Sequence, residues 1–343
     1  MFGDFSCFDL CGTPYEVGRD YGLRDLSNIR RVLSHYVDVS GWFGSSLVDV
    51  CSLLICGDEF WGLDGLEEFR GISEGAGVPV ESLIYHNLQK YAVGACTHFA
   101  GEFGESGRFY HGANIDVPAF LILRDSLTFH FQRRIISDGI PYLIPAMAGI
   151  LYGIAGFNAC GICASSSMLV DAKAPKVVTG KFHGRIICEL LSSCKNLDEA
   201  AKFLSQVRGW GGWSIAVSSP KQKKVIYAEY HGNEVIVDTK TNRFVCSNHS
   251  ILFPTDKKNI PDHSRLRFER LNQTLCCNKN YAMPELALFD KFNPIKNTES
   301  KFRTMNTVFR TDHVVSILAN DCGNYYFANS KNAEQKKWNA INW

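Results

Sequence analysis

The spacing of hydrophobic positions along the chain changes near residue 96. Before it, apolar residues recur three or four positions apart, the period of an amphipathic helix. This spacing predicts helices over 14–39, 66–73 and 80–91. After residue 96, short runs alternate between apolar and polar side chains, which is the period of a half-buried strand. The pattern therefore indicates a helical segment followed by a β-rich one.

The β-rich part contains two sets of predicted strands. The first set covers 97–100, 108–114, 127–136, 141–146, 149–156 and 160–168, and helices follow at 182–194 and 198–207, the second with Asp198 as its N-cap. The second set covers 213–218, 224–230, 234–238 and 243–247, followed by helices at 264–277 and 283–290 and by strands at 307–310, 313–319 and 325–329. Two strand sets with helices before, between and after them favour an α+β fold of one domain, 1–343, in which two sheets pack face to face under helical layers.

Composition narrows the functional classes. Of 343 residues 45% are hydrophobic, enough for a sizeable core, and Lys+Arg 36 against Asp+Glu 35 leaves no basic stripe for nucleic acid. The N-terminus lacks the basic leader and apolar core of a signal peptide. The longest apolar stretch, 142–157, is too short to span a bilayer. We therefore expect a cytoplasmic protein with no transmembrane segment and no nucleic-acid partner.

The spacing of the thirteen cysteines does not suggest a disulfide framework, and a chain of this length does not need one. We interpret most of them as small buried hydrophobic residues in a reducing compartment. Cys160 and Cys163 make the one Cys-x-x-Cys motif, but a structural zinc site needs a second pair of ligands. We predict no metal and no cofactor.

Cys96 lies at the change of period, in Gly94-Ala95-Cys96-Thr97-His98. A small residue before Cys-Thr, followed by a hairpin with Asn114 and Asp116, suggests self-cleavage between Ala95 and Cys96. The thiol would attack the Ala95 carbonyl, and water would cleave the resulting thioester. The freed α-amine, with a pKa of about 7.7–8.0, could then take the proton of a thiol whose pKa is about 8.5.

Several motifs resemble the isopenicillin-N acyltransferase (acyl-coenzyme A:6-aminopenicillanate acyltransferase) family of N-terminal-nucleophile hydrolases. They are Gly12–Gly18 with Gly22, Glu68–Val78, Cys96-Thr97, His111–Asp116 and Ser247-Asn248-His249. The resemblance implies a four-layer αββα sandwich of two antiparallel sheets, with a helical segment 1–95 and a chain 96–343 that begins with the nucleophile. The sequence departs from the family's usual pattern at three positions. They are Ala95, where glycine is usual, His98, where a small hydroxyl residue is usual, and Val117, where an aromatic residue is usual.

Roles for the other candidates follow from acyl-transfer chemistry, which needs a nucleophile, a base and oxyanion donors. Asp116 either orients the Cys96 ammonium or satisfies a turn, and Asn248 either donates to the oxyanion or caps a loop. Thr97 is a candidate donor during the self-cleavage.

The resemblance implies that an arginine supports the catalytic site. Arg303 is the first candidate, and Arg185 is the alternative. The candidates for substrate contact are Asn114, His98 and Asn158.

The predicted activity is hydrolysis or transfer of the acyl group of a small linear amide or acyl thioester, through a thioester on Cys96. The cleaved N-terminal segment would be a partner, and the oligomeric state stays open. One alternative is a Cys-His thiol hydrolase that does not cleave itself and uses His98, His111 or His249. Another is a catalytically silent binding protein with the same fold.

Overall fold

The computed structural model describes twelve stretches of the chain. They are residues 6–34, 58–91, 96–103, 107–116, 129–170, 180–239, 243–256, 258, 260–276, 287–288, 313–329 and 338–341. Two predicted elements lie outside these stretches: the strand 307–310, and the helix 283–290 except for its residues 287–288. Residues 35–39 of the first predicted helix also lie outside them.

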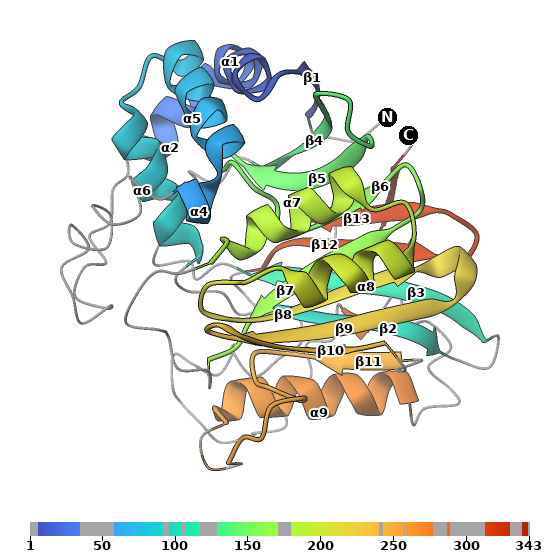
Figure 1. The fold of residues 1–343 in the computed structure, drawn as a ribbon. Helices are drawn as coiled ribbons and strands as arrows, with labels where there is room; N and C mark the ends of the chain where they lie inside the picture. Colours follow the sequence, from blue (N-terminus) through green and yellow to red (C-terminus); the bar gives the residue numbers. More distant parts are fainter. Residues whose placement is uncertain are drawn as a thin grey trace.

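Two sheets form the centre of the molecule (Figure 1). The large sheet has the order β1 (Cys7–Gly12), β4 (Phe129–Ile136), β5 (Tyr142–Met147), β6 (Ala155–Asn158), β7 (Cys163–Met168), β8 (Gly212–Ser219), β9 (Lys224–His231) and β10 (Glu234–Asp238). The small sheet has the order β11 (Arg243–Cys246), β2 (Thr97–Phe103), β3 (Arg108–Asp116), β12 (His313–Asn320), β13 (Tyr325–Asn329) and β14 (Asn339–Ile341).

The prediction of two purely antiparallel sheets is wrong at one edge. β1 pairs with β4 in parallel, with Cys7 opposite Phe131 and Gly12 opposite Ile136. No hairpin joins these strands, because the helices of the N-terminal segment lie between them in the sequence, so their direction is not forced to alternate. All other neighbouring described strands are antiparallel.

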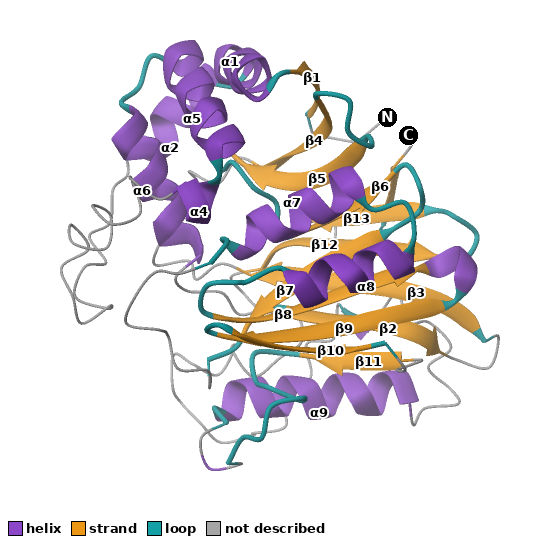
Figure 2. Ribbon diagram, in the orientation of Figure 1, coloured by secondary structure: helices purple, strands orange, loops and turns teal. Residues whose placement is uncertain are grey.

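Helices cover the outer faces of both sheets (Figure 2). The N-terminal segment supplies α1 (Pro14–Arg24), α2 (Leu26–Ser34), α4 (Asp58–Trp61), α5 (Leu63–Ala76) and α6 (Val80–Tyr91). The large sheet is also covered by α7 (His183–Ser193) and α8 (Leu197–Gln206), and α9 (Asp262–Cys276) lies beside β11 and β2 of the small sheet. None of the helices described here is long and apolar enough to cross a membrane.

Alternation along the strands divides the core into three layers of packing. On β7, Ala164 joins the core beneath the helices of the large sheet, whereas its neighbour Cys163 packs between the sheets. On β2, Phe99 packs with Leu271 of α9. The order is therefore helices, large sheet, small sheet, helix, which confirms the predicted αββα sandwich.

Helices α1 and α5 pack with their backbones in close contact, and glycines make this possible. A Cβ on Gly18 would lie 2.2 Å from the carbonyl oxygen of Glu68, and one on Gly71 would lie 2.2 Å from that of Tyr15. Gly22 and Gly75 face the partner helix in the same way. By propensity, glycines such as Gly18 and Gly22 disfavour a helix interior, yet here they allow the two helices to come together.

Several predicted bounds differ from the observed ones. The predicted helix 66–73 is longer, as α5, and the predicted strand 149–156 overlaps β6 only at its last two residues. The first helix is interrupted at Asp25, whose carboxylate accepts a hydrogen bond from Nδ2 of Asn28 at 2.6 Å, and such local side-chain bonds compete with helix continuation. Helix α8 is capped by Asn196, whose side chain accepts from the Glu199 N–H, and Asp198 lies inside its first turn instead of at the N-cap.

Candidate active site

Cys96 directly precedes β2 and is 4% exposed. Cys96 lines a cavity of about 40 Å³ that lies between the sheets and the start of α7. Apart from Cys96, Asp116, Tyr152 and His183, the wall is apolar or aromatic and includes Ile115, Phe129, Met147, Ile150, Ile154 and Trp213. A thiol in such a place is largely shielded from bulk water.

The pairing of β2 with β3 brings Asp116 to the same cavity. Thr97 is opposite Asn114 in this antiparallel ladder, so the last residue of β3 lies beside the first residues of β2. Asp116 is 1% exposed and lines the cavity together with Cys96. Two of the predicted site residues are therefore brought together.

A buried arginine that was not predicted, Arg267 of α9, joins the nucleophile to Asn248. Its Nη1 donates to the carbonyl oxygen of Cys96 at 3.0 Å and to Oγ1 of Thr97 at 2.7 Å. Its Nη2 donates to Oδ1 of Asn248 at 2.6 Å, and the residue is fully buried. The charged guanidinium thus fixes three groups around the start of β2.

A sequence signal for Arg267 does exist. Ser264, Arg267, Leu271 and Leu275 follow one another three or four positions apart, and all four are buried. The apolar stripe of α9 therefore continues towards its N-terminus through two polar residues. A polar residue in line with a buried stripe indicates a buried hydrogen-bonding role.

Asn248 is fully buried and is held on all its polar atoms. Its Nδ2 donates to Oγ of Ser167 at 2.9 Å and to the carbonyl oxygen of Met168 at 2.8 Å. Its backbone N–H donates to Oγ of Ser264 at 2.8 Å. Both hydrogens of the Asn248 amide are therefore engaged within the protein, and the residue is linked to Cys96 through Arg267.

The histidines that flank the predicted motifs lie between the sheets. His98 is hydrogen-bonded to Oγ of Ser165 at 2.9 Å and to Oγ of Ser214 at 3.1 Å. His111 is hydrogen-bonded to the same Ser165 oxygen at 2.8 Å and to Oγ of Ser218 at 2.7 Å. Burial lowers the pKa of each ring to about 3, so both are neutral at pH 7. His98 was predicted to contact substrate, but its ring nitrogens face these serines.

Two further predicted contact residues are satisfied elsewhere. Asn114 donates from Nδ2 to the Leu288 carbonyl at 2.9 Å, and it accepts from Ser316 of β12 within the small sheet. Asn158 donates to the carbonyls of Leu191 and Cys194 at the end of α7. Neither lies among the residues that line the Cys96 cavity.

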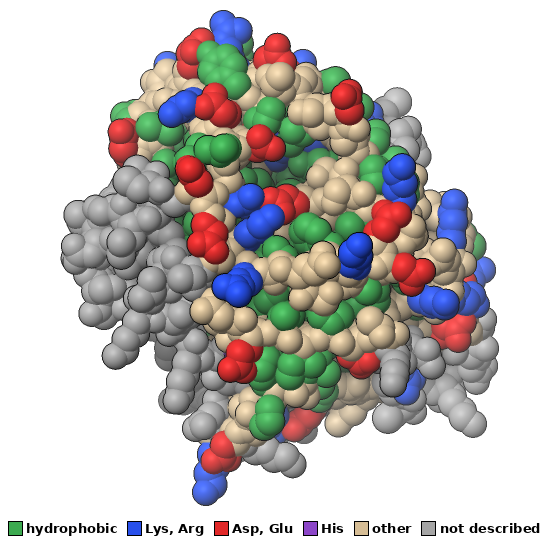
Figure 3. Space-filling view, viewed as in Figure 1, with side chains coloured by type: hydrophobic (Ala, Val, Ile, Leu, Met, Phe, Trp, Pro, Cys, Tyr) green, Lys and Arg blue, Asp and Glu red, His purple; other side chains and the backbone are tan. Residues whose placement is uncertain are grey.

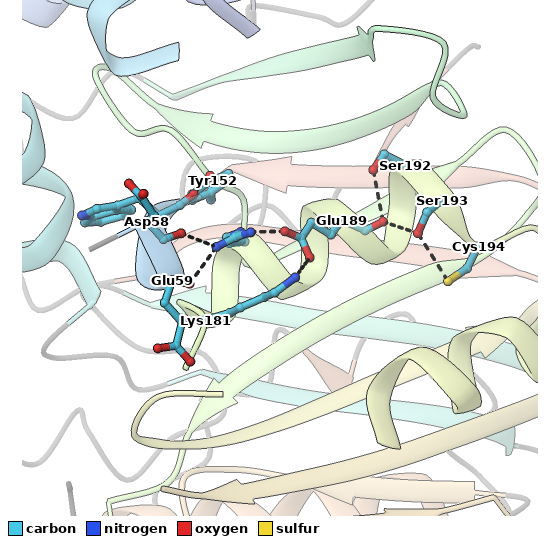
Figure 4. Close-up of polar contacts among 10 residues, drawn as sticks. Asp58, Glu59, Tyr152, Lys181, Glu189, Ser192, Ser193 and Cys194 are labelled. Carbon is cyan, nitrogen blue, oxygen red and sulfur yellow. Dashed lines mark hydrogen bonds and ion pairs between the residues drawn. The ribbon is translucent and has the colours of Figure 1, made fainter. Parts of the chain in front are cut away.

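Of the two arginines proposed for the site, Arg303 lies outside the described residues, as does Ala95. Arg185 lies on α7, where it donates to Oε1 of Glu189 at 2.6 Å and to the carbonyl oxygens of Asp58 and Glu59. Figure 4 shows Glu189 also bound by Lys181. Arg185 therefore connects α7 to α4.

This contact borders a separate surface pocket of about 630 Å³ between α4, α5 and α7. Charged side chains of both signs are interspersed over this face (Figure 3). No cluster of metal-ligating side chains occurs among the residues that the structure describes.

His183 and Trp213 form an aromatic wall of the Cys96 cavity that the sequence did not reveal. Their rings stack with centroids 3.2 Å apart and planes 10° apart. Burial lowers the pKa of His183 well below its usual value, so the ring is neutral. A neutral imidazole thus lines the same cavity as the thiol.

Three solved structures are similar at low sequence identity. A mutant conjugated bile acid hydrolase from Clostridium perfringens is 13% identical, with 72% of this chain and 92% of that chain covered and a TM-score of 0.48. An N-acylethanolamine-hydrolyzing acid amidase ortholog from Caenorhabditis elegans is 13% identical, covering 72% and 100%, with a TM-score of 0.47. A penicillin V acylase from Agrobacterium tumefaciens is 13% identical, covering 68% and 83%, with a TM-score of 0.45.

No curated protein matches the chain in sequence. The family profile of acyl-coenzyme A:6-aminopenicillanic acid acyl-transferase matches residues 104–332, which include Asp116, Asn248 and Arg267. That match covers more than half of the chain and confirms the resemblance found in its motifs. The protein is an enzyme that belongs to the acyl-coenzyme A:6-aminopenicillanic acid acyl-transferase family.

Proposed function

We propose that the chain cuts itself between Ala95 and Cys96 and then hydrolyses or transfers the acyl group of a small linear amide or acyl thioester. The observation that carries the proposal is the shared cavity of Cys96 and Asp116, with Arg267 bound to the carbonyl oxygen of Cys96. Family membership supports a small acyl substrate.

In the self-cleavage step Sγ of Cys96 attacks the carbonyl carbon of Ala95. The carbon–nitrogen bond breaks, the nitrogen gains the proton that the thiol loses, and a thioester forms. Water then adds to the thioester, which releases the Ala95 carboxyl group and restores the thiol. Arg267 holds the Cys96 backbone during the attack, because its guanidinium donates to the carbonyl oxygen of Cys96 and to the hydroxyl of Thr97.

During turnover the new α-amine accepts the thiol proton, and Asp116 orients the resulting ammonium. The thiolate attacks the acyl carbonyl, and the proton passes to the leaving group. Water or an amine then resolves the thioester, giving hydrolysis or transfer. For Asn248 to donate to the oxyanion, Nδ2 must release its bond to Ser167 or to Met168.

The segment 1–95 remains bound after the cut in this proposal. Glu68 of α5 forms a buried ion pair with Arg134 of β4. The Tyr152 hydroxyl donates to the Trp61 carbonyl at 2.6 Å, and β1 extends the large sheet. We include in the proposal the cytoplasmic setting that the sequence predicts.

Mass spectrometry under denaturing conditions tests the cut. Wild-type protein should give two fragments that end at Ala95 and begin at Cys96, and Cys96→Ala should stay intact and inactive. An N-acyl amine or acyl thioester should leave its acyl group on the Cys96 thiol. Intact wild-type protein after prolonged incubation would refute self-cleavage.

A second candidate is a Cys-His thiol hydrolase that does not cleave itself, and one observation favours it. The His183 ring lines the cavity of Cys96, where a histidine base would have to lie, although burial lowers its pKa and makes it a weak proton acceptor. His183→Gln distinguishes the two. It should abolish acylation of Cys96 in an uncut Cys-His enzyme, and it should leave cleavage and acylation in place if the α-amine is the base.

A further inference from the structure

Glu229 of β9 is a carboxylate that is fully buried and surrounded by hydrogen-bond donors. Its Oε1 accepts from the Tyr227 hydroxyl and from the Ile251 N–H, each at 2.6 Å. Its Oε2 accepts from the Leu252 N–H at 2.9 Å and from the Phe253 N–H at 3.1 Å. Three consecutive backbone amides thus point at one carboxylate, and bonds to an ionised acceptor are about twice as strong as neutral ones.

These amides belong to the loop that follows β11, residues 247–253, which we call the Asn248 loop. His231, two residues after Glu229, is hydrogen-bonded to Oγ of Ser250 at 2.5 Å. The His231 ring also stacks on Phe253, with centroids 4.1 Å apart. The end of β9 therefore binds the distal half of the loop through both a carboxylate and a ring.

The proximal half of the loop is held by α9, in addition to the bonds of the Asn248 amide to β7. Ser264 and Arg267 of α9 bind the backbone and Oδ1 of Asn248. Because β9 belongs to the large sheet and α9 covers the small sheet, the Asn248 loop is fixed between opposite sides of the sandwich. Asn248 lies three residues before the first amide that Glu229 holds.

We propose that Glu229 is a positioning residue for Asn248, and through Arg267 for Cys96. This inference rests on the proposed function of Cys96. Glu229 is not among the residues that line the Cys96 cavity. Its bonds to residues 251–253 help to hold the loop in the arrangement in which Asn248 meets Arg267.

Glu229→Gln tests the inference, because an amide of the same shape replaces one pair of acceptor sites by donors that face backbone N–H groups. Glu234→Gln is the matched control, since Glu234 is an exposed residue at the start of the neighbouring strand β10. Hydrogen exchange of the Ile251, Leu252 and Phe253 amides should be about tenfold faster or more in Glu229→Gln. The control should exchange like wild type.

Kinetics per titrated Cys96 thiol give the second readout. In Glu229→Gln, kcat should fall about tenfold or more while KM changes less than about twofold, because the loop does not line the cavity. In a double-mutant cycle, Glu229→Gln should add no further loss to Asn248→Ala. A purely structural residue would instead lower the folded fraction and leave kcat per thiol unchanged.

Unchanged exchange at the three amides, unchanged kcat per thiol, or additive losses in the cycle would each overturn the inference. If Glu229→Gln does not fold, Tyr227→Phe removes one donor from the same carboxylate and should give a smaller change in the same direction. If wild-type protein forms no acyl-Cys96, the proposed function fails, while the exchange measurement still tests the hold of Glu229 on the loop.

Discussion

Arg267 and Asn248 are joined by a hydrogen bond of 2.6 Å from Nη2 to Oδ1, although one lies on α9 and the other on the loop after β11. The same guanidinium reaches Cys96 and Thr97 with Nη1. One side chain therefore sets the relative positions of the nucleophile and of the amide proposed to stabilise the oxyanion.

Replacing Arg267 by lysine should impair both folding and chemistry. An ammonium cannot make the forked contacts to Cys96, Thr97 and Asn248, and the acceptors left without a donor are buried. We expect a loss of about 2–4 kcal/mol in the free energy of unfolding, measured by urea titration, and slower self-cleavage.

The matched control is Arg265→Lys, two residues earlier on the same helix. Arg265 forms exposed ion pairs with Asp262 and Glu269, so the change should stay within about 0.5 kcal/mol. Equal effects of the two substitutions would show that the buried contacts of Arg267 do not matter.

Gly71→Ala should separate α1 from α5. The new methyl group would lie 2.2 Å from the carbonyl oxygen of Tyr15, which is backbone and cannot rotate away. Despite the better helix propensity of alanine, we expect a loss of about 1–3 kcal/mol in thermal or urea unfolding. Arg70→Ala, at the exposed neighbouring position, should change stability by about 0.5 kcal/mol or less, and a stabilised Gly71→Ala would contradict the packing.

His98 and His111 should make the fold sensitive to acid. Burial lowers the pKa of each to about 3, whereas an unfolded histidine has a pKa of about 6.5, so below pH 6.5 the unfolded chain binds more protons than the folded one. Stability therefore falls as the pH decreases from about 6.5 towards 3. His111→Gln should reduce that slope by up to about 1.4 kcal/mol per pH unit in urea titrations at pH 4–7. An unchanged slope would mean that the pKa of His111 is the same in the folded and the unfolded chain.

If the chain is cut after Ala95, its two parts should stay together until they are denatured. The Glu68–Arg134 ion pair is buried and connects residues on either side of the cut. Size-exclusion chromatography of cleaved protein should give one native peak that contains both fragments.

Glu68→Gln leaves Arg134 without its charge partner, which costs about 3–5 kcal/mol for a buried pair, and should release the small fragment at lower urea concentration. Glu67→Gln, which breaks only a partly exposed pair with Arg70, is the control. Two separate native peaks for wild type would refute the association.

Much of the fold could be predicted from the sequence where local pattern and turn chemistry agree. Pro79 and an apolar stripe predict a helix over 80–91, and α6 has those bounds. The alternating run at 234–238 likewise matches β10. β1 was missed, because a strand that adds to a distant edge leaves no hairpin signal in its neighbourhood.

The site was harder to predict, because its contacts join distant segments. Cys96 and Asp116 could be paired from the sequence, since a single hairpin connects them. Arg267 was missed because nothing near it in the chain shows that α9 packs over the start of β2. His98 was misplaced because the period of a strand, not proximity to the nucleophile, decides which face a side chain occupies.

Ser165 bonds to both His98 and His111, yet its hydroxyl has a single proton. At most one of the two rings can accept from it, so at least one ring must carry its own proton on the nitrogen that faces Ser165. That ring is neutral, and its other nitrogen must then accept from Ser214 or from Ser218. The tautomers of the two imidazoles are therefore coupled. The nitrogen NMR shifts of one ring should report on the proton position in the other.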